Sequence, residues 1–166
     1  MDEDRLIRTA VRVRRGKLAD ADVLGELNGL VQQLHSDAEP AEFKAPDAAA
    51  AAEFFRGQLQ RADMVILLAE LGDHVVGYLT AEETRRRDNP FTEAFGMLYI
   101  HHLAVAESAR RRGVGRALMA AAEEEARRRG LKDLRLDFWS FNEAAGRFFQ
   151  EHGFDAYNIR MRRAIS

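Results

Sequence analysis

Residues 110–119, with the sequence RRRGVGRALM, join two segments of different character. The apolar residues 97–105 predict a strand, and the Ala-, Leu- and Glu-rich residues 114–129 predict a helix that ends at Gly130. A turn with two glycines therefore leads into a helix N-terminus, where backbone N–H groups lack intrahelical partners and the dipole favours negative charge. The arginines add donors suited to phosphate oxygens. The stretch predicts a site for a ligand that carries phosphate.

The composition is that of one globular domain. The chain has 166 residues, 46% of them hydrophobic, a net charge of −2 and no cysteine. The lack of cysteine excludes disulfides, thiolate nucleophiles and thiolate zinc sites, and we expect no metal. Neither a signal peptide nor a membrane span is evident, so we expect a cytoplasmic protein with no membrane contact. We expect an N-terminal extension over residues 1–10 and a single domain over residues 11–166.

The hydrophobic pattern alternates between strand and helix periods. Strands are predicted over residues 11–14, 64–69, 75–80, 97–105, 134–139 and 159–163, and helices over residues 20–35, 47–61, 114–129 and 142–152. The order is antiparallel in the front half and strand–helix–strand–helix–strand in the back half. It predicts an α/β fold with a single mixed β-sheet.

Two motifs together resemble those of the GNAT N-acetyltransferases. The turn is neither a Walker loop, which needs Gly-Lys-Ser/Thr, nor a dinucleotide fingerprint, because Leu118 stands where a third glycine is required. Its Arg-x-x-Gly-x-Gly pattern is similar to the acetyl-CoA pyrophosphate turn of that family, and residues 142–154, NEAAGRFFQEHGF, are similar to its last helix. The resemblance covers residues 11–163. It implies a sheet of about six to seven strands with four flanking helices, and acetyl-CoA as co-substrate.

The resemblance also implies which residues bind acetyl-CoA. They would come from the fourth strand, the turn and the last helix: Leu103, Ala104, Val105, Arg110, Arg111, Arg112, Gly113, Val114, Gly115, Arg116, Asn142, Phe148 and Phe149. Several of these have a plain structural alternative. Asn142 is a good N-cap residue, and the two phenylalanines suit a core at helical spacing. The arginines alone could form a solvated cluster.

The fourth strand departs from the family at its centre. Relatives often carry a glutamate at the position of His101, whereas this chain has His101 and His102. An amine with a pKa near 10.4 must lose a proton to attack a thioester, which costs about 4.6 kcal/mol at pH 7. A neutral imidazole can accept that proton, so both histidines are catalytic candidates. Alternation predicts that the two side chains point to opposite faces of the sheet.

A second departure concerns the departing thiol. Phe149 stands where many relatives carry a tyrosine that is proposed to protonate the thiolate. Tyr157, Ser140 or water could replace it, or coenzyme A could leave as a thiolate, since a thiol pKa of ~8.5 makes that tolerable. Leu103 to Val105 would polarise the carbonyl through a backbone N–H.

The sequence favours an acetyl-CoA-dependent N-acetyltransferase that works by direct attack in a ternary complex. Carboxylates after the first helix would suit a small polyamine- or aminoglycoside-like acceptor better than a protein. The alternative is a GNAT-like module that binds acyl-CoA without chemistry, as a sensor or partner subunit. Dispersed arginines and a negative net charge argue against nucleic-acid binding. A homodimer is expected only because dimers are frequent among relatives.

Overall fold

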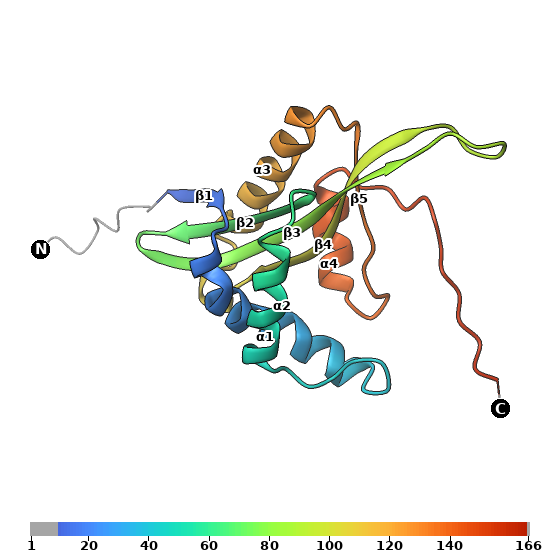
Figure 1. Ribbon diagram of the computed structural model, residues 1–166. Helices are drawn as coiled ribbons and strands as arrows, with labels where there is room; N and C mark the ends of the chain where they lie inside the picture. Colours follow the sequence, from blue (N-terminus) through green and yellow to red (C-terminus); the bar gives the residue numbers. More distant parts are fainter. Residues whose placement is uncertain (1–9, 166) are drawn as a thin grey trace, which may run out of the picture.

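The computed structural model describes residues 10–165 and contains one five-stranded sheet (Figure 1). The strands lie in the order β1-β2-β3-β4-β5. Their bounds are β1 Val11–Arg15, β2 Met64–Leu71, β3 His74–Arg86, β4 Phe95–Val105 and β5 Asp133–Leu136. The first four strands pair antiparallel, and β5 pairs parallel to β4. The mixed α/β sheet predicted from the sequence is confirmed.

The strand count is lower than predicted. Five strands form instead of six to seven, because residues 159–163 are extended chain that pairs with no strand in the described part of the protein. Figure 1 shows the C-terminal segment leaving the sheet after α4. Ile159 and Met161 are therefore 81% and 94% exposed. They alternate with arginines as in a strand, but their side chains do not pack in the core of residues 10–165. Residues 1–9 of the expected N-terminal extension lie outside the described residues.

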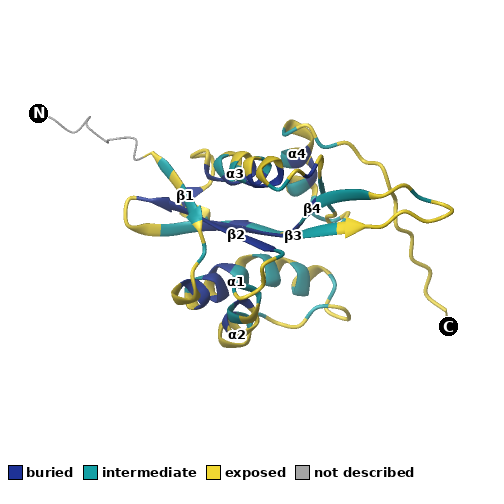
Figure 2. Cartoon of the chain, turned by 45° about the horizontal axis from the view of Figure 1, so that its top comes forward, coloured by how far each residue is buried: buried dark blue, intermediate teal, exposed yellow. Residues whose placement is uncertain are grey.

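Two pairs of helices cover the two faces of the sheet (Figure 2). The helices are α1 Ala21–Ala38, α2 Ala48–Gln58, α3 Val114–Arg128 and α4 Glu143–Glu151, with short 3-10 turns η1 Leu18–Asp20 and η2 Glu107–Ala109. Helices α1 and α2 lie on one face, and α3 and α4 lie on the other. No helix within residues 10–165 has the length and apolar character needed to cross a lipid bilayer.

The core consists of two clusters separated by the sheet. On the α3/α4 face, Val65 and Leu67 of β2 pack with Leu118 of α3. On the α1/α2 face, Ile66 and Leu68 of the same strand pack with Phe55 and other residues of the helices. Every residue of β2 is buried, which explains the continuous apolar sequence of residues 64–69, and the buried Glu70 is paired with Arg12 and Arg14.

Helices α1 and α2 pack tightly against each other at Gly25. A Cβ on Gly25 would lie 2.9 Å from the backbone nitrogen of Ala52 and closer still to the carbonyl oxygen of Ala48. Gly25→Ala should therefore lower the free energy of unfolding by about 1–3 kcal/mol through overpacking, despite the higher helix propensity of alanine. Urea unfolding measures the change.

Gly29→Ala in the same helix is the control. Its nearest neighbour would be Pro46 Cβ, 4.0 Å away, so the propensity gain of up to ~1 kcal/mol should appear. Equal effects of the two substitutions would contradict the proposed packing constraint.

Candidate functional site: a glycine turn beside an open strand edge

The turn before α3 has an unusual backbone and leaves three amides without partners. Gly113 is the N-cap with a φ of 82°, and Arg111 has a φ of 58°, the only positive value at a non-glycine position within residues 10–165. For a non-glycine residue such as Arg111, this backbone conformation costs of order 1–3 kcal/mol. Within the same residues, no acceptor bonds to the N–H groups of Val114, Gly115 or Arg116. These N–H groups can bind an anion.

The arginines around the turn are also without ionic partners. Arg110, Arg111, Arg112 and Arg116 are exposed, and none forms an ion pair with another described residue. The arginines at the far end of α3 behave differently, because residues 127–129 pair with glutamates of α3 and β3. The turn therefore carries a positive charge that residues 10–165 do not neutralise.

Helix α4 packs against the first turn of α3. A Cβ on Gly115 would lie 3.0 Å from the ring of Phe148, so glycine permits this close contact. Phe149 is 8% exposed and packs in the core on the α3/α4 face. Asn142 caps α4, accepting the N–H of Ala145 on its side-chain oxygen at 3.1 Å. The capping and core roles foreseen as alternatives are thus present.

Strands β4 and β5 separate in the middle of the sheet. Their pairing ends at Ile100 and Leu136, whereas β4 continues to Val105. The last five residues of β4 therefore have no partner on that side within the described chain. Val114, which is 1% exposed, fixes the start of α3 against the same end of the sheet.

The amides of this free edge can be identified from one hydrogen bond. Ala106 donates its N–H to the carbonyl oxygen of Val76, near the start of β3, at 2.8 Å. Because successive strand amides point to opposite edges, the N–H groups of Leu103 and Val105 point to the edge that β5 has left. The N–H of Ala104 points to β3. Of the three predicted backbone donors, two are available.

A β-bulge places both histidines on one face of the sheet. Thr80 pairs with His102 and Ala81 pairs with Ile100, so His101 is an additional residue in β4. The alternation of side chains shifts at this residue. The prediction that His101 and His102 point to opposite faces is wrong, because it assumed a regular strand.

Both histidines line a recess of about 140 Å³ against α2. Phe54, Phe55, Gln58, Arg61, Met64, Thr80 and Glu82 complete its wall. His101 Nε2 lies 3.0 Å from Glu82 Oε2, and Arg61 binds the other oxygen of the same carboxylate. The hydrogen bond from Arg61, with a smaller contribution from His101, holds the pKa of Glu82 below its usual value. The sequence did not reveal the contact between Glu82 and His101. Alternation indicated only that Glu82 shares one face of its strand with Tyr78 and Thr80.

His102 is partly buried and neutral. Its ring lies edge-on to Phe55 and Tyr78, and its Nδ1 is buried without a hydrogen-bond partner in the described residues. Burial lowers the pKa of His102 to about 4, with smaller contributions from the charges of His101 and His35. His102 is therefore a hydrogen-bonding group at neutral pH rather than a cation.

Tyr157 lies apart from the turn. Its ring packs against the Arg135 guanidinium of β5, 5.1 Å from the ring centre, and its side chain is largely exposed. Tyr99 is on β4 and donates its hydroxyl to Asp137 at 2.7 Å. Burial and this carboxylate raise the pKa of Tyr99 to about 12. Within residues 10–165, no contact joins Tyr157 to the predicted cofactor residues.

An aromatic cluster borders the open end of the sheet. It joins His35 of α1, Phe43 of the following loop, and Trp139 and Phe141 of the β5–α4 loop, with ring centres 4.8 to 6.0 Å apart. Burial lowers the pKa of His35. Sequence reasoning did not group these rings, because they come from segments about 100 residues apart. The nearby carboxylates of residues 39 and 42 both bind Arg162.

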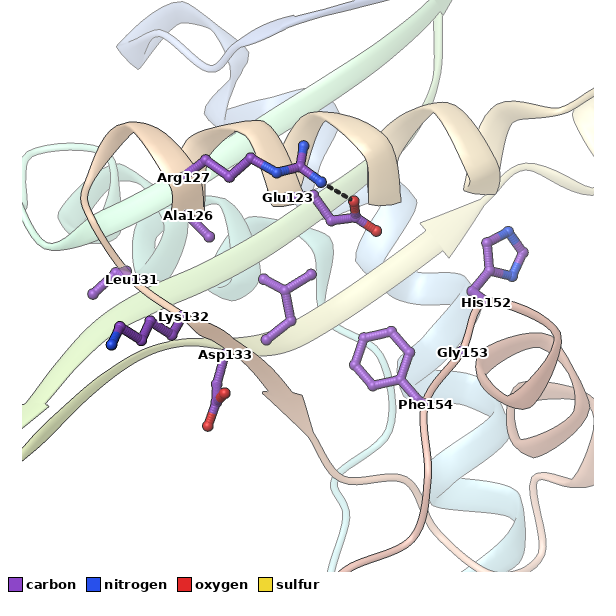
Figure 3. Close-up of a pocket in the computed structure, with 10 residues that line it drawn as sticks. Glu123, Ala126, Arg127, Leu131, Lys132, Asp133, His152, Gly153 and Phe154 are labelled. Carbon is purple, nitrogen blue, oxygen red and sulfur yellow. Dashed lines mark hydrogen bonds and ion pairs between the residues drawn. The ribbon is translucent and has the colours of Figure 1, made fainter. Parts of the chain in front are cut away.

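A second recess lies elsewhere. It measures about 340 Å³ and lies among the C-terminal half of α3, the start of β5 and the end of α4 (Figure 3). An ion pair between Arg127 and Glu123 lies at its rim, and His152 faces it. None of the site residues predicted from the sequence lines this recess. Within residues 10–165, no group of three or more acidic or histidine side chains could hold a metal ion.

Comparison with known proteins identifies the family. The model of the acetyltransferase (GNAT) family matches residues 30–154. A Bacillus subtilis protein named uncharacterized N-acetyltransferase YhfO is 25% identical over 146 residues, which cover 87% of this chain and 90% of that protein.

Solved structures share the fold. A tetramutant of the BH1408 protein from Bacillus halodurans superimposes with a TM-score of 0.88 at 20% identity, over 93% of this chain and 99% of that one. The aminoglycoside N-acetyltransferase AAC(6')-Iy in complex with CoA has a TM-score of 0.71 at 17% identity, over 93% and 95% of the two chains. The chain therefore belongs to the acetyltransferase (GNAT) family.

Proposed function

We propose that this protein transfers the acetyl group of acetyl-CoA to a primary amine of a small cationic molecule. The observation that carries the proposal is the junction of three features at one end of the sheet. They are the turn of residues 110–116 with its unpaired amides, the free edge of β4, and the histidine pair at the bulge. The first two suit a phosphate-bearing thioester, and the third suits an amine that must lose a proton.

Acetyl-CoA fits the groups that the chain leaves without partners. The amides of Val114, Gly115 and Arg116, with the surrounding guanidinium groups, would hold its pyrophosphate. The N–H groups of Leu103 and Val105 are the free donors for its pantetheine arm and thioester carbonyl. Acetyl-CoA supplies the activated acetyl group. The CoA complex of AAC(6')-Iy, which shares the fold, supports this assignment.

His101 is the better candidate for the proton acceptor. An ammonium group with a pKa near 10.4 would transfer its proton to His102, with a pKa of about 4, about 6 pKa units uphill, which costs about 9 kcal/mol. His101 is also 40% exposed, so the proton can pass on to water. We assign His102 to accepting an N–H hydrogen bond from the neutral amine.

The chain offers no phenol where many relatives have one. Phe149 is in the core, and Tyr157 is held by Arg135 away from the turn. The position of Tyr157 therefore does not support a role in protonating the departing sulfur. A thiol with a pKa of ~8.5 can leave as a thiolate near neutral pH.

The aromatic cluster supports a cationic acceptor. Rings of His35, Phe43, Trp139 and Phe141 offer faces to an ammonium group by cation–π attraction. Asp137 lies beside Tyr99 at the same open end of the sheet. AAC(6')-Iy is named an aminoglycoside acetyltransferase, which supports a small polyamine or amino sugar.

The pyrophosphate site is tested by Gly113→Asp. A carboxylate at this position repels the phosphates, so we expect binding of acetyl-CoA to be lost, by a factor of about 100 or more, in isothermal calorimetry. Gly130→Asp is the matched control, because Gly130 also has a positive φ, 67°, and open space around it. The control should lose stability but bind the cofactor normally. Normal affinity of the Gly113 variant would refute the site.

The chemistry is tested by thiol release from acetyl-CoA with a panel of alkylamines, polyamines and aminoglycosides. We expect turnover with at least one of them. His101→Ala should lower kcat by about 100-fold, the scale of a general base, and leave the affinity for acetyl-CoA unchanged. Binding of acetyl-CoA without turnover on the whole panel would instead favour the binding module. An unchanged rate would remove His101 from the mechanism.

The neutral state of His102 has a consequence for stability. The unfolded chain takes up a proton near pH 6.5, whereas the folded protein resists protonation until about pH 4. The free energy of unfolding should therefore fall as the pH drops through this window. His102→Gln should reduce that fall by up to about 3 kcal/mol in urea unfolding at pH 7 and pH 4. Equal pH dependence of the two proteins would show that His102 is not buried in its neutral form.

A further inference from the structure

Glu82 is fully engaged by two partners in the recess below the bulge. Oε1 accepts a hydrogen bond from Arg61, and Oε2 lies 3.0 Å from Nε2 of His101. Arg61 is itself held by Asp63 at 2.7 Å, so the chain Asp63–Arg61–Glu82–His101 runs from the start of β2 to the bulge of β4. Each contact joins side chains of opposite charge or complementary hydrogen-bonding character.

The donor in the contact with His101 follows from the charge of Glu82. A carboxylate that binds an arginine is ionised, and an ionised carboxylate can only accept hydrogen bonds. The lowered pKa of Glu82 agrees with this state. The hydrogen between the two side chains must therefore be on Nε2 of His101. In a neutral imidazole the other nitrogen, Nδ1, then carries the free lone pair.

We propose that Glu82 is a positioning residue, which holds the His101 ring with its hydrogen on Nε2 and leaves Nδ1 to take the proton of the acceptor amine. This rests on the proposed function. In the step, the amine N–H bond breaks, Nδ1 gains the proton, and His101 becomes an imidazolium that remains hydrogen-bonded to Glu82. The imidazolium then releases the proton to solvent.

Glu82 does not take the proton itself. Both of its oxygens are occupied, and its contact with Arg61 lowers its affinity for a proton. A carboxylate with an ordinary pKa of ~4.3 is already a far weaker base than imidazole. The bulge adds His102 to the same recess, because in a regular strand only one of the two histidines would face Glu82 and α2.

Glu82→Ala tests the proposal, with Glu83→Ala as the matched control. Glu83 also binds two arginines, Arg85 and Arg129, but it lies next in β3 and faces α3. Thermal melting confirms that both variants fold. We expect Glu82→Ala to lower kcat by about tenfold or more, as loss of a carboxylate behind a functional histidine does, with an unchanged KM for acetyl-CoA. Glu83→Ala should retain the kcat of the unmodified protein.

Long-range ¹H–¹⁵N spectra of the imidazoles provide a readout independent of turnover. His101→Ala identifies the signals of His101 among the five histidines. At pH 8 we expect the hydrogen on Nε2 in the unmodified protein and in Glu83→Ala. In Glu82→Ala the two nitrogen signals should move toward the exchange-averaged positions of a ring without a partner.

Three results would overturn the proposal: a hydrogen on Nδ1 in the unmodified protein, unchanged ring signals in Glu82→Ala, or an unchanged kcat in that variant. If no amine on the panel is acetylated, the proposed function fails. The ring signals then still decide whether Glu82 controls the tautomer of His101.

Discussion

A single additional residue in β4 is the constraint on which the candidate site depends. The bulge at His101 shifts the alternation of side chains, so that Leu98 and Ile100 face α3 on one side of it, while His102 and Ala104 face the α1/α2 layer on the other. Two adjacent histidines thereby share one recess. Glu82 of β3 contacts His101 in the same recess. Without the bulge, one imidazole would lie in the opposite core.

The second constraint is the separation of β4 from β5. A strand that extends beyond its partner exposes a row of unpaired backbone donors and acceptors. Such an exposed edge can pair with another chain, so proteins usually cover it. Here the free edge lies next to the start of α3, whose first amides are also unpaired. Unsatisfied groups of two different elements therefore converge. The turn that joins the sheet to the helix contains Arg111 in a left-handed backbone conformation, which is unfavourable for a non-glycine residue.

The sequence predicted most elements correctly where the hydrophobic periodicity agreed with the positions of residues, such as glycine, that end helices and strands. The apolar run of residues 64–69 in β2 and the glycine-bounded helix α3 are examples. It failed where pairing decided the outcome. Residues 159–163 have the alternation of a strand but pair with no strand among residues 10–165, and β5 ends at Leu136 rather than at Trp139. Alternation describes which residues could face a core, whereas strand formation also needs a partner backbone.

The candidate site divides in the same way. The turn, its arginines and the helix cap at Asn142 follow from local residue types, because glycine torsions, unpaired N-terminal amides and capping are properties of a few consecutive residues. The sequence by itself therefore determined the residues and the local backbone of a candidate anion site at the start of a helix. Only the tertiary structure decided the common face of His101 and His102, the contact with Glu82 and the aromatic cluster. These depend on strand register and on segments far apart in the chain, whose relative positions are set by packing.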